Sequence, residues 1–216
     1  MPPRPSLQRE RAAWADEVLL VGVDEAGRGP LAGPVVAAAV VFPPQCRAVR
    51  GLRDSKVLPP RVRLVLAERI RVRALGYGVG AASSHEIDRF NIRVATALAM
   101  HRAIAALVRR PPLLGRPYRI LIDGLPLPEV GYPHDALVDG DARCQSIAAA
   151  AVIAKTVRDR LMERLAVRHP GYGWATNMGY GTEEHHEGLK AHGPTAHHRR
   201  TFEPIAQLSL FEFGVS

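Results

Sequence analysis

Short apolar runs recur along the chain, bounded by glycine, proline or charged residues. Three such runs, at residues 18–23, 35–42 and 76–82, are too short for typical helices, so we predict strands there. The same reasoning predicts a buried strand over residues 118–122 and a short strand over residues 136–138.

Longer stretches place apolar residues three or four positions apart, which is the spacing of helices. Residues 61–73 and 91–109 have this pattern, and Pro111 follows the second stretch, where proline removes a backbone donor. The longest predicted helix covers residues 145–168. Its first half is almost wholly apolar and should be buried, whereas the charged residues from Arg158 onward should mark its emergence toward solvent.

The mixture of strands and helices indicates an α/β or α+β protein. With 216 residues and 47% hydrophobic content, the chain suits one domain with modest extensions. We predict a main domain over residues 18–204. Residues 1–17 should be a mobile arm (1–10) leading into a short helix (about 11–17), and residues 205–216 should form a tail.

Composition narrows the class of protein. No apolar run is long enough to span a bilayer and the N-terminus has no apolar signal core, so we expect a cytoplasmic protein without a membrane partner. Two distant cysteines suit reduced thiols. The formal charge of +8 favours a polyanionic partner such as nucleic acid, although an arginine-rich composition also arises from genome bias.

Candidate metal-binding and phosphate-binding residues follow directly after the first predicted strand. Asp24 and Glu25 supply hard oxygen ligands of the kind that divalent cations prefer. Gly27 and Gly29 let the backbone approach a ligand closely, and Arg28 offers a guanidinium that matches phosphate. By itself, this segment is equally consistent with an ordinary acidic turn.

Residues 24–35, Asp-Glu-Ala-Gly-Arg-Gly-Pro-Leu-Ala-Gly-Pro-Val, resemble the opening signature of bacterial ribonuclease HII, the type 2 ribonuclease H. Further matches follow in the family's order, so the resemblance runs from about residue 18 to about 204. They are Asp54-Ser55-Lys56, Asn91-Ile92 with Ala95-Thr96, Ile122-Asp123-Gly124, Gly140-Asp141, residues 147–155 with Arg158-Asp159, Gly179-Tyr180-Gly181-Thr182 and His198-Arg199-Arg200-Thr201-Phe202.

The resemblance implies the ribonuclease H-like fold, a mixed five-stranded sheet flanked by helices with a C-terminal helical section. It also implies a catalytic, metal-binding cluster of Asp24, Glu25, Asp123 and Asp141. Such carboxylates would repel one another unless cations neutralise them, which points to Mn²⁺ or Mg²⁺ and a two-metal mechanism. Neighbouring residues of a strand face opposite sides, so Asp24 and Glu25 should converge only if the backbone leaves the strand there. Taken singly, Asp141 is equally a helix cap and Asp123 equally a turn residue.

The implied activity is that of an endoribonuclease, acting on RNA–DNA hybrids and on duplex DNA that contains ribonucleotides, in ribonucleotide excision repair and DNA replication. It would cut 5′ to a ribonucleotide and leave a 5′-phosphate and a 3′-hydroxyl. By resemblance, Gly27, Arg28 and Gly29 read the 2′-hydroxyl, and Tyr180 packs on the next sugar. The expected contacts to backbone phosphate are Lys56, Lys155, Arg158 and Arg199.

Three positions depart from the family pattern: Asp139 and Met178 replace frequent lysines, and Ala151 replaces a frequent serine. We expect an active enzyme in which the two missing cations weaken phosphate binding and Asp139 alters metal affinity.

The tail adds a separate hypothesis. Gln207-Leu208-Ser209-Leu210-Phe211 resembles the peptide by which bacterial replication proteins dock on the DNA sliding clamp, with Gln207, Leu208, Leu210 and Phe211 as the contacts. The alternative is that these apolar residues fold back on their own domain.

Two other functions remain open: a hybrid-binding protein that does not cut, and another nuclease of the same fold, such as a junction resolvase or a transposase. The second would share the acids but would not need Gly27-Arg28-Gly29 with Tyr180. Histidines near the C-terminal end make zinc a weaker alternative, because only His192 and His197 approach a ligand spacing. We expect a monomer.

Overall fold

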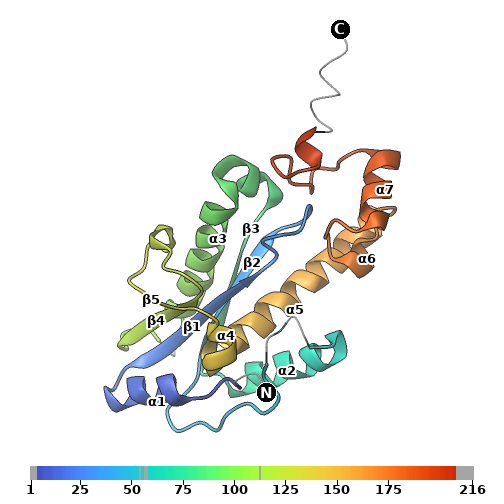
Figure 1. The fold of residues 1–216 in the computed structure, drawn as a ribbon. Helices are drawn as coiled ribbons and strands as arrows, with labels where there is room; N and C mark the ends of the chain where they lie inside the picture. Colours follow the sequence, from blue (N-terminus) through green and yellow to red (C-terminus); the bar gives the residue numbers. More distant parts are fainter. Residues whose placement is uncertain (1–3, 54, 56–57, 112, 208–216) are drawn as a thin grey trace.

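The structure is a computed structural model that describes residues 4–53, 55, 58–111 and 113–207. Its centre is a five-stranded sheet in the order β3-β2-β1-β4-β5 (Figure 1). β1 pairs antiparallel with β2 and parallel with β4, so the sheet is mixed, as predicted. The strands are β1 Leu19–Ala26, β2 Val35–Val41, β3 Gly76–Ala82, β4 Tyr118–Asp123 and β5 Asp135–Leu137.

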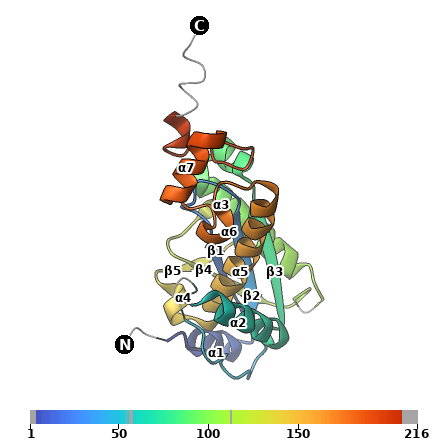
Figure 2. The same ribbon diagram turned by 90° about the vertical axis from the view of Figure 1, so that its right-hand side faces the viewer.

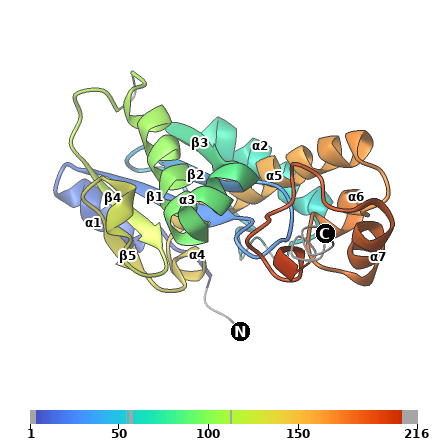
Figure 3. The ribbon, with the colours of Figure 1, turned by 90° about the horizontal axis from the view of Figure 1, so that it is seen from above.

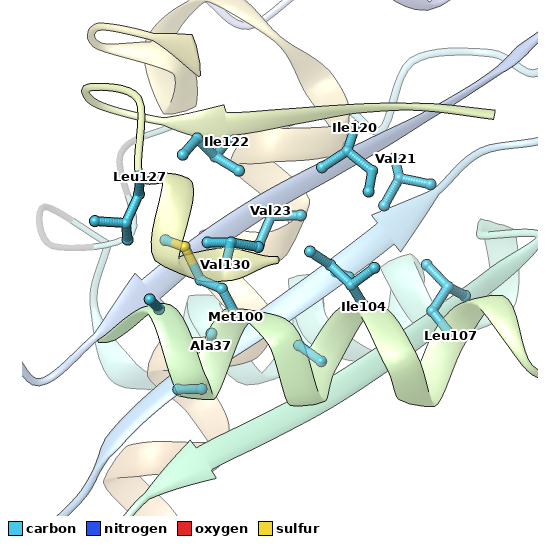
Figure 4. Close-up of a cluster of buried hydrophobic side chains, with 14 of the residues drawn as sticks. Val21, Val23, Ala37, Met100, Ile104, Leu107, Ile120, Ile122, Leu127 and Val130 are labelled. Carbon is cyan, nitrogen blue, oxygen red and sulfur yellow. The ribbon is translucent and has the colours of Figure 1, made fainter. Parts of the chain in front are cut away.

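Helices cover both faces of this sheet. α3 (Ser84–Val108) packs on one face, and α5 (Gln145–Arg168) with α2 (Pro60–Arg73) on the other. Figure 4 shows the first of these cores, in which Val21 and Val23 of β1 meet Met100 and Ile104 of α3. β2 is buried on both sides, which explains why it is an unbroken apolar run.

Small residues allow α3 to lie very close to the edge strand β3. A Cβ atom built on Gly78 would lie 2.1 Å from the carbonyl oxygen of Ala103, and one on Gly80 would lie 2.3 Å from that of Ala99. Side chains at either position would push the helix away from the sheet.

The two ends of the molecule differ. α6 (Trp174–Asn177) and α7 (Glu183–His192) stand beyond the end of β1, and α1 (Gln8–Ala15) lies at the opposite end (Figures 1, 2 and 3). The remaining short elements are α4 (Gly140–Arg143) and the 3₁₀ turn η1 (Pro128–Val130). The predicted C-terminal helical section is therefore present.

The N-terminal prediction was wrong in its boundary. The helix begins at Gln8 rather than near residue 11, and Pro5, Leu7 and Glu10 are buried. Glu10 Oε1 accepts hydrogen bonds from the backbone N–H (2.7 Å) and the hydroxyl (2.8 Å) of Ser146, at the start of α5. Residues 5–10 are thus anchored to the core through Pro5, Leu7 and Glu10 and are not a mobile arm.

Two helices also differ from expectation. α3 begins seven residues before the predicted Asn91, with a capping box between Ser83 and Glu86, and it kinks at Asn91, where φ is 69°. Arg158 and Asp159 of α5 are buried, so the helix does not emerge into solvent where its first charges occur. Among the described helices, none is long and apolar enough to cross a membrane.

Candidate active site

Three of the four predicted acids come from neighbouring elements at one end of the sheet, where β1 and β4 finish. Asp24 lies near the end of β1, Asp123 ends β4, and Asp141 is in the first turn of α4. β1 and β4 are parallel and in register up to Val23 and Ile122, so the next residues, Asp24 and Asp123, are brought side by side.

Side-chain alternation places those two carboxylates on the same face. Val23 and Ile122 belong to the core under α3, so the residues that follow them point to the face covered by α5. Glu25 then lies on the opposite side. Our expectation that the backbone leaves the strand at Asp24 was wrong, because β1 continues to Ala26 with Asp24 and Glu25 paired to Ala38 and Ala37.

The acids nevertheless act on one another electrostatically. The pKa of Asp24 is raised well above its usual range, first by burial of the carboxyl group and then by the negative charges of Glu25, Asp123 and Asp141. A hydrogen bond from the Glu25 N–H to Asp24 Oδ1 (2.6 Å) opposes this shift. A nearby cation would therefore offset the repulsion that acts on the Asp24 carboxylate.

The donor set fits a hard divalent cation. Asp123 Oδ1 accepts from the Gly140 N–H at 2.7 Å, which orients this carboxylate and links β4 to α4. Carboxylate oxygens select Mg²⁺ or Mn²⁺ over softer metals. Across the part of the chain that the structure describes, no three acidic, histidine or cysteine side chains are already gathered as a metal site, so binding would require the carboxylates to reorient.

The glycine loop lies beside Tyr180. A Cβ atom built on Gly29 would lie 3.9 Å from the Tyr180 ring, which is half-exposed. Arg28 is exposed as well, and its Nη1 lies 3.4 Å from Glu25 Oε1. The structure therefore brings the predicted 2′-hydroxyl reader, the predicted sugar-packing tyrosine and one of the acids together on one surface.

Arg158 and Arg199 are placed differently from our expectation of phosphate contacts. Both are fully buried, and their guanidinium groups donate to backbone carbonyl oxygens. Arg199 binds the carbonyls of Gly27, Arg28 and Gly33, whereas Arg158 binds those of Ala32, Pro34 and Met178. Burial, and to a smaller extent the charge of Arg158, lowers the pKa of Arg199 to about 9. These arginines hold the glycine loop from behind, and their guanidinium groups are buried rather than exposed.

A hydrogen-bonded histidine pair supports Tyr180. The Thr195 N–H donates to Nδ1 of His198 (2.8 Å), so the proton of that ring is on Nε2. His198 Nε2 donates to His185 Nε2 (3.0 Å), which also accepts from the Trp174 indole (3.1 Å). His185 Nδ1 then donates to the carbonyl oxygen of Tyr180 (2.9 Å). All four ring nitrogens of His185 and His198 therefore take part in hydrogen bonds.

Our sequence reasoning had assigned no role to these supporting residues. His198 stood in a quoted motif, but burial of a histidine is not visible in a single sequence. Asp88 was missed as well. Its carboxylate accepts hydrogen bonds from the backbone N–H groups of Arg200 and Thr201, both at 3.0 Å, and so links residues 198–202 to α3.

Lys155 lies in a groove of about 670 Å³ between α2, α5 and α6. Its Nζ donates to Asp159 (2.7 Å), which also binds Arg63 (2.8 Å). Arg63 donates in turn to the carbonyl of Ser55 (2.8 Å), in the loop that contains the predicted contact Lys56. Lys56 itself lies outside the described residues.

The three departures from the family pattern occupy distinct positions. Met178 and Asp139 both adopt left-handed backbone conformations, with φ of 51° and 53°. Ala151 is buried in α5. Of the predicted clamp contacts, Gln207 is exposed at the end of the described chain, and Leu208, Leu210 and Phe211 lie outside the described residues.

Comparison with known proteins agrees with this geometry. The family model described as ribonuclease HII matches residues 21–205. Ribonuclease HII of Synechococcus sp. (strain JA-3-3Ab) is 50% identical over 214 residues, covering 98% of this chain and 94% of the relative. That of Thiobacillus denitrificans is 51% identical, covering 89% of this chain and 93% of the relative.

Solved structures share the fold. The ribonuclease H2 of Pyrococcus horikoshii OT3 superposes with a TM-score of 0.73 at 26% identity, covering 90% of this chain and 98% of the other. The ribonuclease HII of Archaeoglobus fulgidus, solved as a complex with PCNA, gives a TM-score of 0.69 at 27% identity, covering 86% and 96%. Both the fold and the resemblance predicted from sequence are thus confirmed, and the chain belongs to the ribonuclease HII family of metal-dependent endoribonucleases.

Proposed function

We propose that this enzyme cuts duplex DNA on the 5′ side of an embedded ribonucleotide, in addition to hydrolysing the RNA of RNA–DNA hybrids. The product would be a nick with a 3′-hydroxyl and a 5′-phosphate. The observation that carries this proposal is the contact-range approach of Gly29 and Tyr180, on the same surface as Glu25.

Sugar recognition would follow from this arrangement. A 2′-hydroxyl both donates and accepts hydrogen bonds, so backbone groups at a glycine loop can bind it whatever the base. Gly29 leaves space at the loop surface, and the flat ring of Tyr180 offers an apolar face to the neighbouring sugar. A deoxyribose fits such a face better than a ribose, and the pair would therefore select an RNA-to-DNA junction.

The carboxylates would hold the metal. We assign Asp24, Glu25 and Asp123 as the main ligands and Asp141 as a further ligand or a group that orients the attacking water. When bound, a pair of Mn²⁺ or Mg²⁺ ions would activate water and stabilise the leaving oxygen. The mutual repulsion that raises the pKa of Asp24 is the property that supports this assignment.

The decisive experiment uses a labelled duplex with one ribonucleotide, incubated with Mn²⁺, Mg²⁺ or chelator. Incision 5′ to the ribonucleotide, dependent on metal and lost in Asp24→Asn, is expected. The control variant Asp16→Asn alters an exposed carboxylate paired with Arg119 and should keep full activity. Binding without incision under every metal condition would instead favour a hybrid-binding protein.

Substrate choice separates the remaining alternative. A junction resolvase or transposase of the same fold would cut all-DNA substrates, so an all-DNA duplex and a branched DNA junction are included. Cleavage of either at a rate comparable to that of the ribonucleotide duplex would overturn the proposal.

We also propose that the tail docks on a DNA sliding clamp through Gln207, Leu208, Leu210 and Phe211. The archaeal relative solved with PCNA supports this idea by analogy. Deletion of residues 207–216 should abolish binding to a bacterial clamp without changing incision of a short duplex. Unchanged clamp binding would refute it.

A further inference from the structure

Four arginines surround a cavity at the end of the sheet away from the acids. The cavity measures about 420 Å³ and is lined by Arg47, Arg50, Arg69 and Arg73 with Ala48 and Val49. Among the residues that the structure describes, none of those lining the cavity is acidic. The volume falls within the range of about 300–1,000 Å³ that is usual for small-ligand sites.

The register of the sheet fixes where this cavity lies. The loop with Arg47 and Arg50 follows β2, whose last residue, Val41, pairs with Val21 near the start of β1. The acids lie at the other end of β1, where Ala26 pairs with Val36. Figure 1 shows the same separation, with the β2–α2 loop beside α1 and the α6–α7 section at the far end. The cavity is therefore distinct from the candidate active site.

The arginines come from two independent segments. Arg73 belongs to the last turn of α2, where the helix dipole stabilises cations, so it alone would need no ligand; Arg69 lies one turn earlier in the same helix. Arg47 and Arg50 come from the loop, and that explanation does not apply to them. Arg73 Nη1 donates to the carbonyl of Ala48 (3.3 Å), which ties the two walls together.

Two acids of the described chain, Glu68 and Glu10, are engaged elsewhere. Glu68 precedes Arg69 in sequence but pairs with Arg71. Glu10 is fully buried and accepts from Ser146. Four exposed arginines thus share one concavity in which no described residue supplies a carboxylate, and their mutual repulsion would be relieved by a bound anion.

We infer that this arginine pocket binds phosphate groups. The planar guanidinium matches two phosphate oxygens at once, which makes arginine the preferred residue for such anions. The phosphates could belong to the backbone of a nucleic-acid duplex that extends past the active site, or to a free polyphosphate such as that of a nucleotide. The chemistry of the pocket is the same for both sources.

The test compares two double variants that each remove two positive charges. Arg47→Gln/Arg69→Gln takes one arginine from each wall and leaves the Arg73 bond to Ala48 intact. Arg109→Gln/Arg116→Gln removes two exposed arginines outside the pocket and serves as the matched control. If the first variant folds poorly by circular dichroism, Arg50→Gln/Arg69→Gln replaces it.

Two probes distinguish the sources, and neither requires incision, so the result does not depend on the proposed function. Binding of a long all-DNA duplex is measured against salt concentration. Loss of two backbone contacts should reduce the slope of log K against log salt by about 1.8, at about 0.9 per contact, in the pocket variant and not in the control.

Tripolyphosphate binding is measured by calorimetry on the same proteins. Loss of this binding in the pocket variant alone, with the duplex slope equal to that of the control, would identify a free polyphosphate as the ligand. Identical behaviour of the two double variants with both probes would overturn the inference, because it would show that the arginines act only through the overall charge.

Discussion

Arg199 Nη1 donates to the backbone carbonyl oxygen of Arg28 over 2.7 Å, although 171 positions separate the two residues. The same buried guanidinium also binds the carbonyl oxygens of Gly27 and Gly33. The glycine loop is therefore held in shape by the C-terminal section.

Replacing Arg199 with lysine should destabilise the protein by roughly 2–4 kcal/mol, because an ammonium group is a compact point charge and lacks the planar fork that reaches the separate carbonyls of Gly27, Arg28 and Gly33. Urea denaturation measures the loss. Arg200 is exposed and serves as the control: Arg200→Lys should change stability by less than about 0.5 kcal/mol. Equal effects of the two substitutions would contradict the structural role of Arg199.

Gly27 and Gly29 should respond differently to alanine. Gly27 has φ +94°, and a Cβ atom there would lie 1.9 Å from Nε of Arg158, so Gly27→Ala should cost several kcal/mol. Gly29→Ala meets no atom closer than Tyr180 at 3.9 Å and should fold normally. If the loop reads the 2′-hydroxyl, Gly29→Ala should still raise KM at least several-fold for a duplex with one ribonucleotide. An unchanged KM would argue against the loop as the reader.

The histidine pair should make the protein acid-sensitive. Burial lowers the pKa of His185, and it lowers that of His198 to about 3, against about 6.5 when unfolded. The unfolded chain then binds more protons as pH falls from about 6.5 toward 3, so stability falls over that window by up to about 1.4 kcal/mol per pH unit for each histidine.

His198→Gln should flatten this pH dependence by about one proton, since glutamine does not titrate. The exposed His85 provides the control, and His85→Gln should leave the slope as in the parent protein. Unfolding free energies measured between pH 4 and 7 give the slopes. A His198→Gln slope equal to that of the parent would show that the buried ring does not carry the effect.

Asp24→Asn should stabilise the protein in chelator, by roughly 1–2 kcal/mol, while removing activity. The pKa of Asp24 is raised, so ionising this carboxyl opposes folding at neutral pH, and the amide avoids both the burial penalty and the repulsion of its neighbours. Thermal unfolding with and without Mn²⁺ tests this. The parent protein should gain stability from the metal and the variant should not. A variant less stable than its parent in chelator would contradict the electrostatic argument.

Glu10 should be essential to the N-terminal helix. Glu10→Ala leaves the N–H and hydroxyl of Ser146 without their acceptor in a buried site, which should cost roughly 2–4 kcal/mol. The adjacent Arg9 is exposed, and Arg9→Ala should be nearly neutral. Denaturant midpoints compare the two. Similar midpoints would mean that α1 contributes little to the core.

The sheet was predictable because its strands are short apolar runs with clear boundaries. β2 and β3 lie within one residue of the predicted ranges, because both segments consist of apolar residues and glycine. The end of β1 was not predictable in the same way. Polar residues normally end a strand, but here the ladder to β2 continues under Asp24 and Glu25.

Charged residues gave the least reliable inferences. A single sequence does not show that backbone carbonyl oxygens surround the guanidinium groups of Arg158 and Arg199. Contacts between these arginines and phosphate at the surface were therefore a reasonable prediction. The start of α3 was missed for a local reason. Asn91, with its positive φ, separates two helical segments, and the second alone had the expected apolar spacing.

The bond between Arg199 and Arg28 also sets an order of events during synthesis. The glycine loop is made early, but the guanidinium that fixes its carbonyls is made 171 residues later. A growing chain can therefore build β1 with its acids in place well before the loop beside them acquires its final shape. The ability to distinguish ribose from deoxyribose should be among the last properties that this polypeptide gains, after the sheet itself has formed.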